Sequence, residues 1–287
     1  MKACWMNGTM VDADDAGISV YDHGLLYGDG VFEGIRFYDT VPFRLDAHLK
    51  RLQRSARALH LDLPYSLEQL AAATRQTALA TQEADGYIRL VVTRGKGALG
   101  IDPRTCAAST VFILADELQV VDSQAKRDGA RLIVSSLRRL SVDQLDPRIK
   151  SLNYLNQIMA RLEANDAGAD EAVILNSNGL VAEGTVDNLF IVTEGVLLTP
   201  PVLDGALDGI TRQVVLELAS SQNIPCREQS LAVYDLLNAD ECFLTGTGAE
   251  LIPVAQLQGR SIGSGERPVY ERLQTAFTQL VRLEAAA

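Results

Sequence analysis

The sequence has few cysteines and few histidines. Its four cysteines, Cys4, Cys106, Cys226 and Cys242, are scattered without metal-binding or redox spacing, and its three histidines form no ligand pattern. We therefore expect reduced thiols and no metal site. Long apolar runs are also missing: no segment is long enough to span a membrane, and the first residues lack the apolar core of a signal peptide. These absences predict a cytoplasmic protein.

Basic residues are scarce relative to acidic ones. The 287 residues include 26 Lys and Arg against 37 Asp and Glu, which gives a formal net charge of −11. This balance argues against nucleic acid as a partner. The length allows two modest domains with a sizeable core. We predict an α+β protein with a small α/β domain over residues 1–116, a connector over 117–124 and a larger domain over 125–287.

Local signals place several elements in the first domain. Asn7-Gly8 predicts a hairpin turn, and Asp46 is a suitable N-cap for a helix that reaches about Leu59. A second helix is expected after Ser66, with Gln69 completing a capping box. An apolar strand then runs from Tyr87 to Arg94.

The stretch Gly95–Gly100 matches the spacing GxGxxG, which is typical of dinucleotide-binding loops. Such a loop must open a helix whose first turn meets the pyrophosphate. Here Ile101-Asp102-Pro103 follows instead, and then another strand over 110–114. We therefore reject the dinucleotide interpretation.

The stretch from Lys150 to Asn188 holds an amine, a phenol at Tyr154 and an acid at Glu183. Lys150 precedes an expected amphipathic helix, so we place it at a loop-to-helix junction where its amine can face a pocket. Asn178-Gly179 predicts a hairpin, and Glu183 ends the strand after it. A carboxylate at such a place needs a cationic or hydrogen-bonding partner. The apolar positions of the expected helix are Leu152, Leu155, Ile158, Met159 and Leu162.

Two later motifs look like anion sites. Gly209-Ile210-Thr211 opens an expected helix, whose first backbone amides are available to a ligand. Thr247 lies in a Gly-Thr-Gly turn that adds a hydroxyl and further amides. A phosphate cradle combined with an amine, a phenol and an acid is what pyridoxal phosphate requires.

Taken together, these motifs resemble the fold-type-IV pyridoxal-phosphate transaminases, and among them most closely the branched-chain amino-acid aminotransferases. The resemblance covers nearly the whole chain. It rests on the motifs Lys150-Ser-Leu-Asn-Tyr154, Glu183-Gly184, Asn188-Leu-Phe, Leu207-Asp-Gly209-Ile210-Thr211-Arg212 and Thr245-Gly246-Thr247-Gly248-Ala-Glu250.

The resemblance implies a role for each cofactor-binding residue. It implies that Lys150 is the catalytic residue, which bonds to the cofactor aldehyde and then acts as general base and acid. Glu183 would pair with the pyridine nitrogen and Tyr154 with the ring phenolate oxygen. Arg51, the amides of Ile210 and Thr211, and the Thr247 hydroxyl would bind the phosphate. Asn188, Gly209 and Gly246 complete the implied cofactor-binding set.

The resemblance also implies the substrates and the assembly. The reaction would move an amino group between branched-chain L-amino acids and 2-oxoglutarate by a ping-pong Schiff-base mechanism. The implied partners are thus amino acids and 2-keto acids, and a homodimer or higher homo-oligomer with shared active sites. Tyr27 and the loop Leu99–Ile101 would come from the partner subunit, and Thr247 and Gly248 would meet the α-carboxylate. The implied substrate-binding set is Tyr27, Phe32, Arg36, Tyr87, Arg89, Ile101, Thr247 and Gly248.

Other reactions on the same fold stay open at this point. Many branched-chain members have aromatic residues in the connector, whereas residues 116–124 have none here. This difference leaves a broader transaminase, or one for D-amino acids or (R)-amines, as an alternative. An aminodeoxychorismate lyase is a second alternative, and a binding protein that has kept the fold but not the activity is a third.

Overall fold

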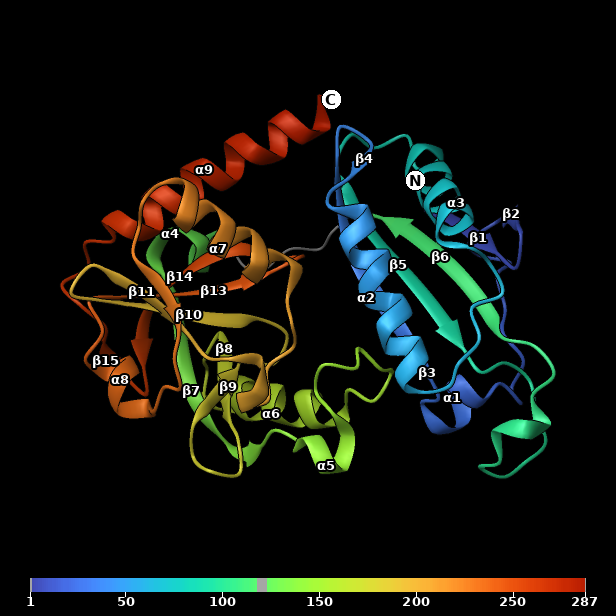
Figure 1. Ribbon diagram of the computed structural model, residues 1–287, viewed down its shortest axis with the longest axis horizontal. Coiled ribbons are helices and arrows are strands. Elements are labelled where there is room, and N and C mark those ends of the chain that lie inside the picture. Colours follow the sequence, from blue (N-terminus) through green and yellow to red (C-terminus); the bar gives the residue numbers. More distant parts are fainter. Residues whose placement is uncertain (1, 118–122, 287) are drawn as a thin grey trace. The chain divides into compact units, whose positions relative to one another are not determined.

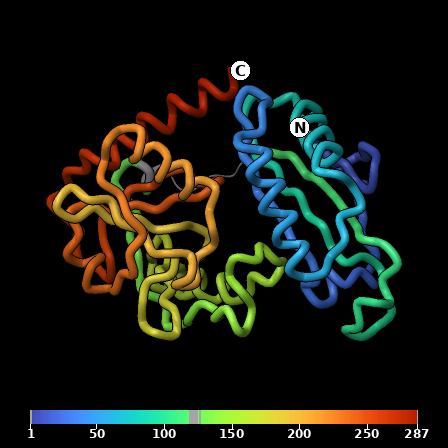
Figure 2. Tube along the Cα trace, viewed as in Figure 1, coloured from blue at the N-terminus to red at the C-terminus, as the bar shows by residue number. Residues whose placement is uncertain are grey.

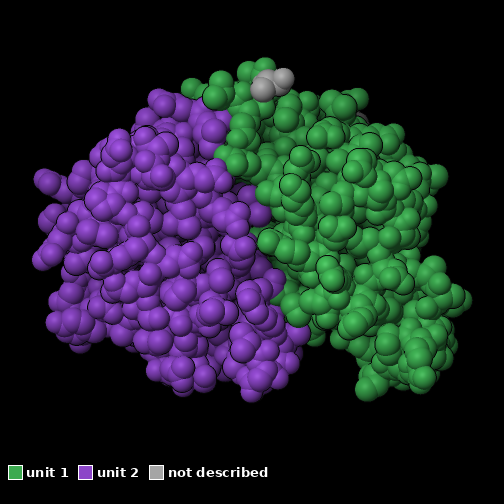
Figure 3. Space-filling view, viewed as in Figure 1, with its two compact units in different colours: residues 1–119, 149–153, 281–287 green, residues 120–148, 154–280 purple. Residues whose placement is uncertain are grey.

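The computed structural model describes residues 2–117 and 123–286, and of the predicted connector over 117–124 residues 118–122 lie outside this description. The chain divides into two compact units. Unit 1 comprises residues 1–119, 149–153 and 281–287, and unit 2 comprises residues 120–148 and 154–280. Figure 1 labels the elements, Figure 2 traces the chain, and Figure 3 colours the two units.

Unit 1 is built on an antiparallel sheet with the strand order β2-β1-β6-β5-β3-β4. Helices α2 and α3 cover one face of this sheet (Figure 1). The elements are β1 (Ala3–Met6), β2 (Thr9–Val11), α1 (His23–Tyr27), β3 (Gly30–Tyr38), β4 (Val41–Pro42), α2 (Leu45–Ala58), α3 (Leu67–Ala80), β5 (Gly86–Thr93), the 3₁₀ helix η1 (Pro103–Thr105) and β6 (Thr110–Asp116).

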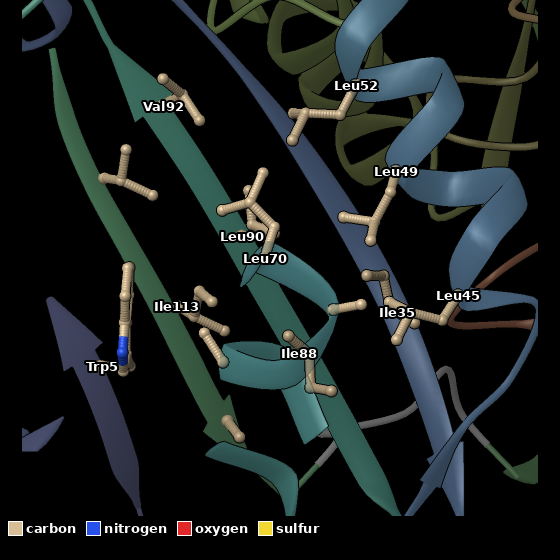
Figure 4. Close-up of a cluster of buried hydrophobic side chains, with 14 of the residues drawn as sticks. Trp5, Ile35, Leu45, Leu49, Leu52, Leu70, Ile88, Leu90, Val92 and Ile113 are labelled. Carbon is tan, nitrogen blue, oxygen red and sulfur yellow. The ribbon is translucent and has the colours of Figure 1, made fainter. Parts of the chain in front are cut away.

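The core of unit 1 lies between the sheet and these two helices. In Figure 4, Leu49 and Leu52 of α2 point toward the sheet, on which Ile35, Ile88 and Leu90 are buried. Burial of each such side chain contributes about 1.5–3 kcal/mol relative to exposure. Strand residues alternate between the two faces of a sheet. The neighbours of these core residues along β3 and β5 therefore lie on the face opposite the helices.

Unit 2 contains a larger mixed sheet with the order β12-β11-β10-β13-β14-β7-β8-β9, in which β15 also pairs with β14. Its elements are α4 (Ser123–Asp128), β7 (Ala130–Arg138), α5 (Val142–Leu145), α6 (Leu155–Asp166), β8 (Glu171–Leu175), β9 (Val181–Glu183), β10 (Asn188–Thr193), β11 (Val196–Thr199), the 3₁₀ helix η2 (Val202–Asp204), α7 (Ile210–Ser221), β12 (Cys226–Glu228), α8 (Val233–Leu237), β13 (Glu241–Gly246), β14 (Glu250–Leu257), β15 (Arg260–Ser261) and the greater part of α9 (Pro268–Ala285), whose residues from 281 on belong to unit 1.

Most local expectations are confirmed. Asn7-Gly8 joins β1 to β2, and the turn containing Asn178-Gly179 joins the antiparallel strands β8 and β9. Ser66 caps α3 in a capping box with Gln69. Gly95–Gly100 does not open an α-helix, because the short η1 and then β6 follow it. The dinucleotide interpretation therefore fails in the structure as well.

Two expectations about helices are wrong. Asp46 is not the N-cap of α2: the residue before the helix is Arg44, in a left-handed conformation with φ 53°, and Asp46 lies in the first turn. There the carboxylate still interacts favourably with the helix dipole. Leu152, expected as one of the apolar positions of the helix after Lys150, precedes α6, which begins at Leu155. On α6 the other four apolar residues are exposed, whereas Gln157, Ala160 and Ala164 are buried. The two alanines are small, which allows the helix to lie close to β7 and β8.

No helix in the described part of the chain combines the length and the apolar character that crossing a membrane demands. Likewise, the described residues contain no cluster of histidine, cysteine, aspartate or glutamate suited to holding a metal ion.

Candidate active site

Lys150 lies in a short extended segment that pairs with the beginning of β3 in unit 1. The backbone N–H of Phe32 donates to the Lys150 carbonyl at 3.0 Å, and the N–H of Leu152 donates to the Gly30 carbonyl at 3.0 Å. The N–H of Lys150 itself donates to the Ser55 hydroxyl of α2 at 3.1 Å. Hydrogen bonds to β3 and to α2 therefore fix the backbone of the lysine, and α6 begins only at Leu155.

Cationic side chains gather around the ring of Phe32. The Lys150 Nζ atom lies 4.5 Å from the centroid of this ring, and the Arg89 Cζ atom also lies 4.5 Å from it. Arg89 in addition contacts the ring of Tyr87, with Cζ 5.6 Å from the centroid. Such contacts are attractive because the ring face carries partial negative charge. The structure thus brings Lys150 together with three of the predicted substrate-binding residues.

A glycine makes room for the phenol of Tyr87. A Cβ atom placed on Gly34 would lie 1.7 Å from the Tyr87 Oη atom, so no other residue fits at position 34 without moving the phenol. Strand alternation puts Phe32, Gly34 and Arg36 on the face of the sheet opposite α2, together with Tyr87. The guanidinium of Arg36 stacks on Tyr38, with Cζ 4.9 Å from the ring centroid.

On the helix-covered face, Glu33 forms a buried cluster with two residues of α2. Its carboxylate accepts hydrogen bonds from Nε and Nη2 of Arg51 at 2.8 and 2.7 Å, and its Oε2 lies 2.7 Å from Nδ1 of His48. Burial alone would raise the pKa of Glu33. The charge and hydrogen bonds of Arg51, with the contact to His48, outweigh burial and bring that pKa to about 2. The carboxylate is therefore ionised and its position orients Arg51.

The environment of Lys150 favours its neutral amine. Loss of hydration is the larger cause and the positive charge of Arg51 the next, and together they lower the pKa of Lys150 to about 8. The negative charge of Glu33 acts in the opposite direction. A lysine with this pKa is partly deprotonated near neutral pH, so its amine can act as a nucleophile and a base.

We expect Lys150→Met to stabilise the ligand-free protein at pH 7. Below pH 8 the wild-type fold holds an ammonium group that is better solvated in the unfolded chain, where its pKa is near 10.5. Wild-type stability should therefore rise as the pH increases from about 8 to 10.5, and the advantage of the variant should shrink over that range. Urea unfolding at several pH values measures this difference. A variant equally or less stable than wild type at pH 7 would contradict the lowered pKa of Lys150.

Tyr27 and Ile101 lie at another part of unit 1. Tyr27 is the last residue of α1, and its hydroxyl accepts a hydrogen bond from the N–H of Gly100 at 2.8 Å. The loop around Gly100 is thereby attached to α1, and Ile101 is 83% exposed.

In unit 2, the carboxylate of Glu183 is buried at the end of β9. Its Oε1 lies 2.8 Å from Nη2 of Arg139, and its Oε2 accepts hydrogen bonds from the N–H of Leu207 at 2.8 Å and from Nδ2 of Asn188 at 3.4 Å. The expectation that this carboxylate needs a cationic or hydrogen-bonding partner is confirmed. Asn188 Nδ2 also donates to the Leu207 carbonyl at 2.9 Å, which ties β10 to the segment before α7.

The N-terminus of α7 adjoins Asn188. Gly209 is the N-cap and supplies no side-chain cap, and Ile210 and Thr211 begin the helix and are buried. A Cβ atom on Gly209 would lie 2.0 Å from Asn188 Oδ1, which excludes any larger residue in this conformation. The first backbone N–H groups of a helix lack intrahelical acceptors. This helix end is therefore suited to an anion.

The turn after β13 completes this part of unit 2. Thr245 pairs with Asn188 across β13 and β10, and its buried hydroxyl oxygen has no hydrogen-bond partner within the described structure. Gly246, Thr247 and Gly248 follow, and a Cβ atom on Gly246 would lie 2.1 Å from Oδ1 of Asp187. An unpartnered buried hydroxyl is costly, so its presence beside a glycine-lined turn fits a site for a polar ligand.

Tyr154 is half-buried and precedes α6 as its N-cap residue. The predicted site residues thus form two sets. Arg51, Lys150 and the substrate-binding residues up to Ile101 belong to unit 1, whereas Tyr154, Glu183 and the phosphate-loop residues belong to unit 2.

Sequence reasoning missed four residues that adjoin the predicted ones, namely Glu33, His48, Arg139 and Thr245. The acidic residue within the glycine-rich stretch 28–34 and the Arg138-Arg139 pair at the end of a strand were visible signals. Neither signal identifies its partner, which is distant along the chain.

Comparison with known proteins identifies the family. The family model for class IV amino-transferases matches residues 30–257. A putative branched-chain-amino-acid aminotransferase of Methanocaldococcus jannaschii is 50% identical over 260 residues, which cover 91% of this chain and 89% of the relative. A D-alanine aminotransferase of Bacillus licheniformis is 34% identical, over 98% of this chain and 97% of the relative.

A solved structure agrees with this relationship. The crystal structure of the branched-chain amino acid aminotransferase of Escherichia coli has a TM-score of 0.94 and 36% identity to this chain, and the match covers 97% of this chain and 94% of that one. The chain belongs to the class IV aminotransferases, and the predicted family and two-domain α+β fold class are confirmed. It is therefore an aminotransferase, in a class whose enzymes use pyridoxal phosphate.

Proposed function

We propose that this protein moves amino groups between branched-chain L-amino acids and 2-oxoglutarate, with pyridoxal phosphate bound at Lys150. The observation that carries the proposal is the position and the pKa of Lys150. Its backbone pairs with β3, and the pKa of its side-chain amine is lowered to about 8. Two of the three relatives named above support the substrate class, since one is a putative branched-chain aminotransferase and the other a branched-chain amino acid aminotransferase.

The residues present fit the cofactor. The α7 N-terminus, where Gly209 leaves no room for a side chain, and the turn containing Thr247 would hold the phosphate, together with Arg51. Glu183 would meet the pyridine nitrogen and Tyr154 the ring oxygen. When bound, pyridoxal phosphate supplies an aldehyde that bonds to amines and a ring that accepts electrons from the substrate α-carbon.

The protein's own part in the reaction follows from its charges. Lys150 Nζ would take the proton from the substrate α-carbon as a base and return it as an acid, which its lowered pKa permits near neutral pH. Tyr87 and Arg89 would bind substrate carboxylate by hydrogen bonding and charge. Phe32, against which both Lys150 and Arg89 lie, would contact the apolar side chain of the substrate.

We further propose that the protein works as a homodimer or higher homo-oligomer in the cytoplasm. Unit 1 exposes apolar residues on α1 and on the loop that follows β5, where Leu25, Leu99 and Ile101 are 57%, 73% and 83% exposed. Unit 2 exposes Leu155, Ile158, Met159 and Leu162 along α6. Exposed apolar patches of this kind commonly mark protein interfaces. A second copy of the chain that covered the unit 1 patch would hold Tyr27 and Ile101 near a shared site.

A D-amino-acid transaminase is the second candidate, favoured by the 34% identity to a D-alanine aminotransferase over nearly the whole chain. The two candidates differ in the hand of the substrate and in whether a branched side chain is preferred. The test is to supply 2-oxoglutarate with L-leucine, L-valine or D-alanine separately.

We expect glutamate and the matching keto acid to form in equal amounts from L-leucine and L-valine, and little product from D-alanine. The reverse preference would replace the first candidate by the second, with the same catalytic residues. Absence of amino transfer from every donor, by protein that has bound the cofactor, would refute both.

A further inference from the structure

The charge on Glu183 depends on its surroundings, because a buried carboxylate that lacks compensation takes up a proton. Its contacts include Arg139 at 2.8 Å, the N–H of Leu207 at 2.8 Å and Asn188 at 3.4 Å. Of these three, Arg139 alone carries a full charge, and both members of the ion pair are 7% exposed at their side chains. Arg139 is therefore the contact that most strongly favours the ionised form.

The guanidinium of Arg139 is oriented by contacts of its own. The residue directly follows β7, and its backbone N–H donates to the Leu175 carbonyl at 2.9 Å. Its Nε donates to the Gly205 carbonyl at 3.2 Å, and its Nη2 lies 2.8 Å from Oε1 of Glu183. Gly205 has φ 108°, and a Cβ atom there would lie 3.5 Å from the Arg139 Cβ atom. The arginine is thus fixed from β7, β8 and the segment before α7.

We propose that Arg139 is a positioning residue that keeps Glu183 ionised, so that the proton shared between Glu183 and the pyridine nitrogen resides on the nitrogen. This inference rests on the proposed function, in which Glu183 faces that nitrogen. A neutral Glu183 would hold the proton on its own oxygen instead. The ring would then accept electrons from the substrate less readily, because its nitrogen would carry no positive charge.

The test follows the ring nitrogen directly. Protein is loaded with pyridoxal phosphate labelled with ¹⁵N in the ring, and the ¹⁵N resonance distinguishes protonated from unprotonated nitrogen. Wild type should give the protonated resonance. Arg139→Gln and Arg139→Met should both move it toward the unprotonated position and lower kcat about tenfold or more. Arg139→Lys retains a positive charge and should keep the wild-type resonance.

A matched control is Arg161→Gln, because Arg161 also pairs with a glutamate of unit 2, Glu171, at 3.1 Å. It should leave the resonance and kcat unchanged. A protonated resonance in Arg139→Gln or Arg139→Met would overturn the inference, and so would an unprotonated one in Arg139→Lys. If the neutral variants do not fold, an unprotonated resonance in Arg139→Lys still overturns the inference.

The same measurements distinguish a failure of the proposed function from a failure of this inference. Wild-type protein that bound no pyridoxal phosphate would refute the function. Glu183→Gln serves as the reference, because an uncharged amide cannot hold a proton on the ring nitrogen. If Glu183→Gln shifts the resonance and the neutral Arg139 variants do not, the function stands and the role of Arg139 is refuted.

Discussion

Replacing Lys150 with alanine is expected to lower amino transfer at least about 10³-fold, because the variant loses both the nucleophile and the general base. The lost group is the side-chain amine of Lys150, whose pKa is about 8 and whose backbone pairs with β3. Initial rates with L-leucine and 2-oxoglutarate measure the effect. The variant should still bind pyridoxal phosphate without forming a bond to it, since the predicted phosphate-binding residues are unchanged.

The control is Lys50→Ala. Lys50 is an exposed residue of α2 next to Arg51 in the chain, and its loss should leave activity within about twofold of wild type, since surface substitutions have small effects. Circular dichroism shows whether both variants are folded. Near-normal turnover in folded Lys150→Ala protein would refute the assigned role of this lysine.

Replacing Glu33 should have the largest effect on stability. Glu33→Ala leaves the guanidinium of Arg51 buried without its partner, which typically costs about 3–5 kcal/mol. Urea unfolding at pH 7 measures this loss. The pKa of Glu33 is about 2 in the folded chain and 4.5 as the unperturbed reference. The carboxylate therefore contributes fully above pH 4.5, and its contribution is lost as the pH falls toward 2, so the two proteins should become more alike in acid.

Glu33→Gln tests the electrostatic link to Lys150. The negative charge of Glu33 raises the pKa of Lys150, so its removal should bring that pKa below about 8. Competitive labelling of amines in the ligand-free protein across a pH range, quantified by mass spectrometry, gives the pKa directly. Glu194→Gln, which changes an exposed acid in a turn of unit 2, is the control. An unchanged or higher pKa of Lys150 in Glu33→Gln would show that the charge of Glu33 does not raise the pKa of Lys150.

Local chemistry made part of this structure predictable. The glycine before α7, the Asn178-Gly179 turn and the Ser66 capping box each depend on residues within a few positions of one another. Their conformations follow from backbone and capping preferences that hold in any fold. The family resemblance likewise rests on short motifs, and the glycine before α7 belongs to one of them.

Contacts between distant segments were not predictable in this way. Glu183 meets Arg139, and Glu33 meets Arg51, only because the sheets and α2 bring these residues together. The apolar positions of α6 show a related limit. Their spacing indicates a helix but does not say whether they face the core or a partner, and Leu155 is 70% exposed.

The central claim is that Lys150 is the residue that binds the cofactor covalently. Borohydride reduction of the protein loaded with pyridoxal phosphate makes that bond permanent, and peptide mapping then locates it. The chain has five lysines, Lys2, Lys50, Lys96, Lys126 and Lys150, so the result is unambiguous. We expect the label on the peptide that contains Lys150, and its loss when L-leucine is added before reduction. A label on another lysine, or none, would contradict the claim.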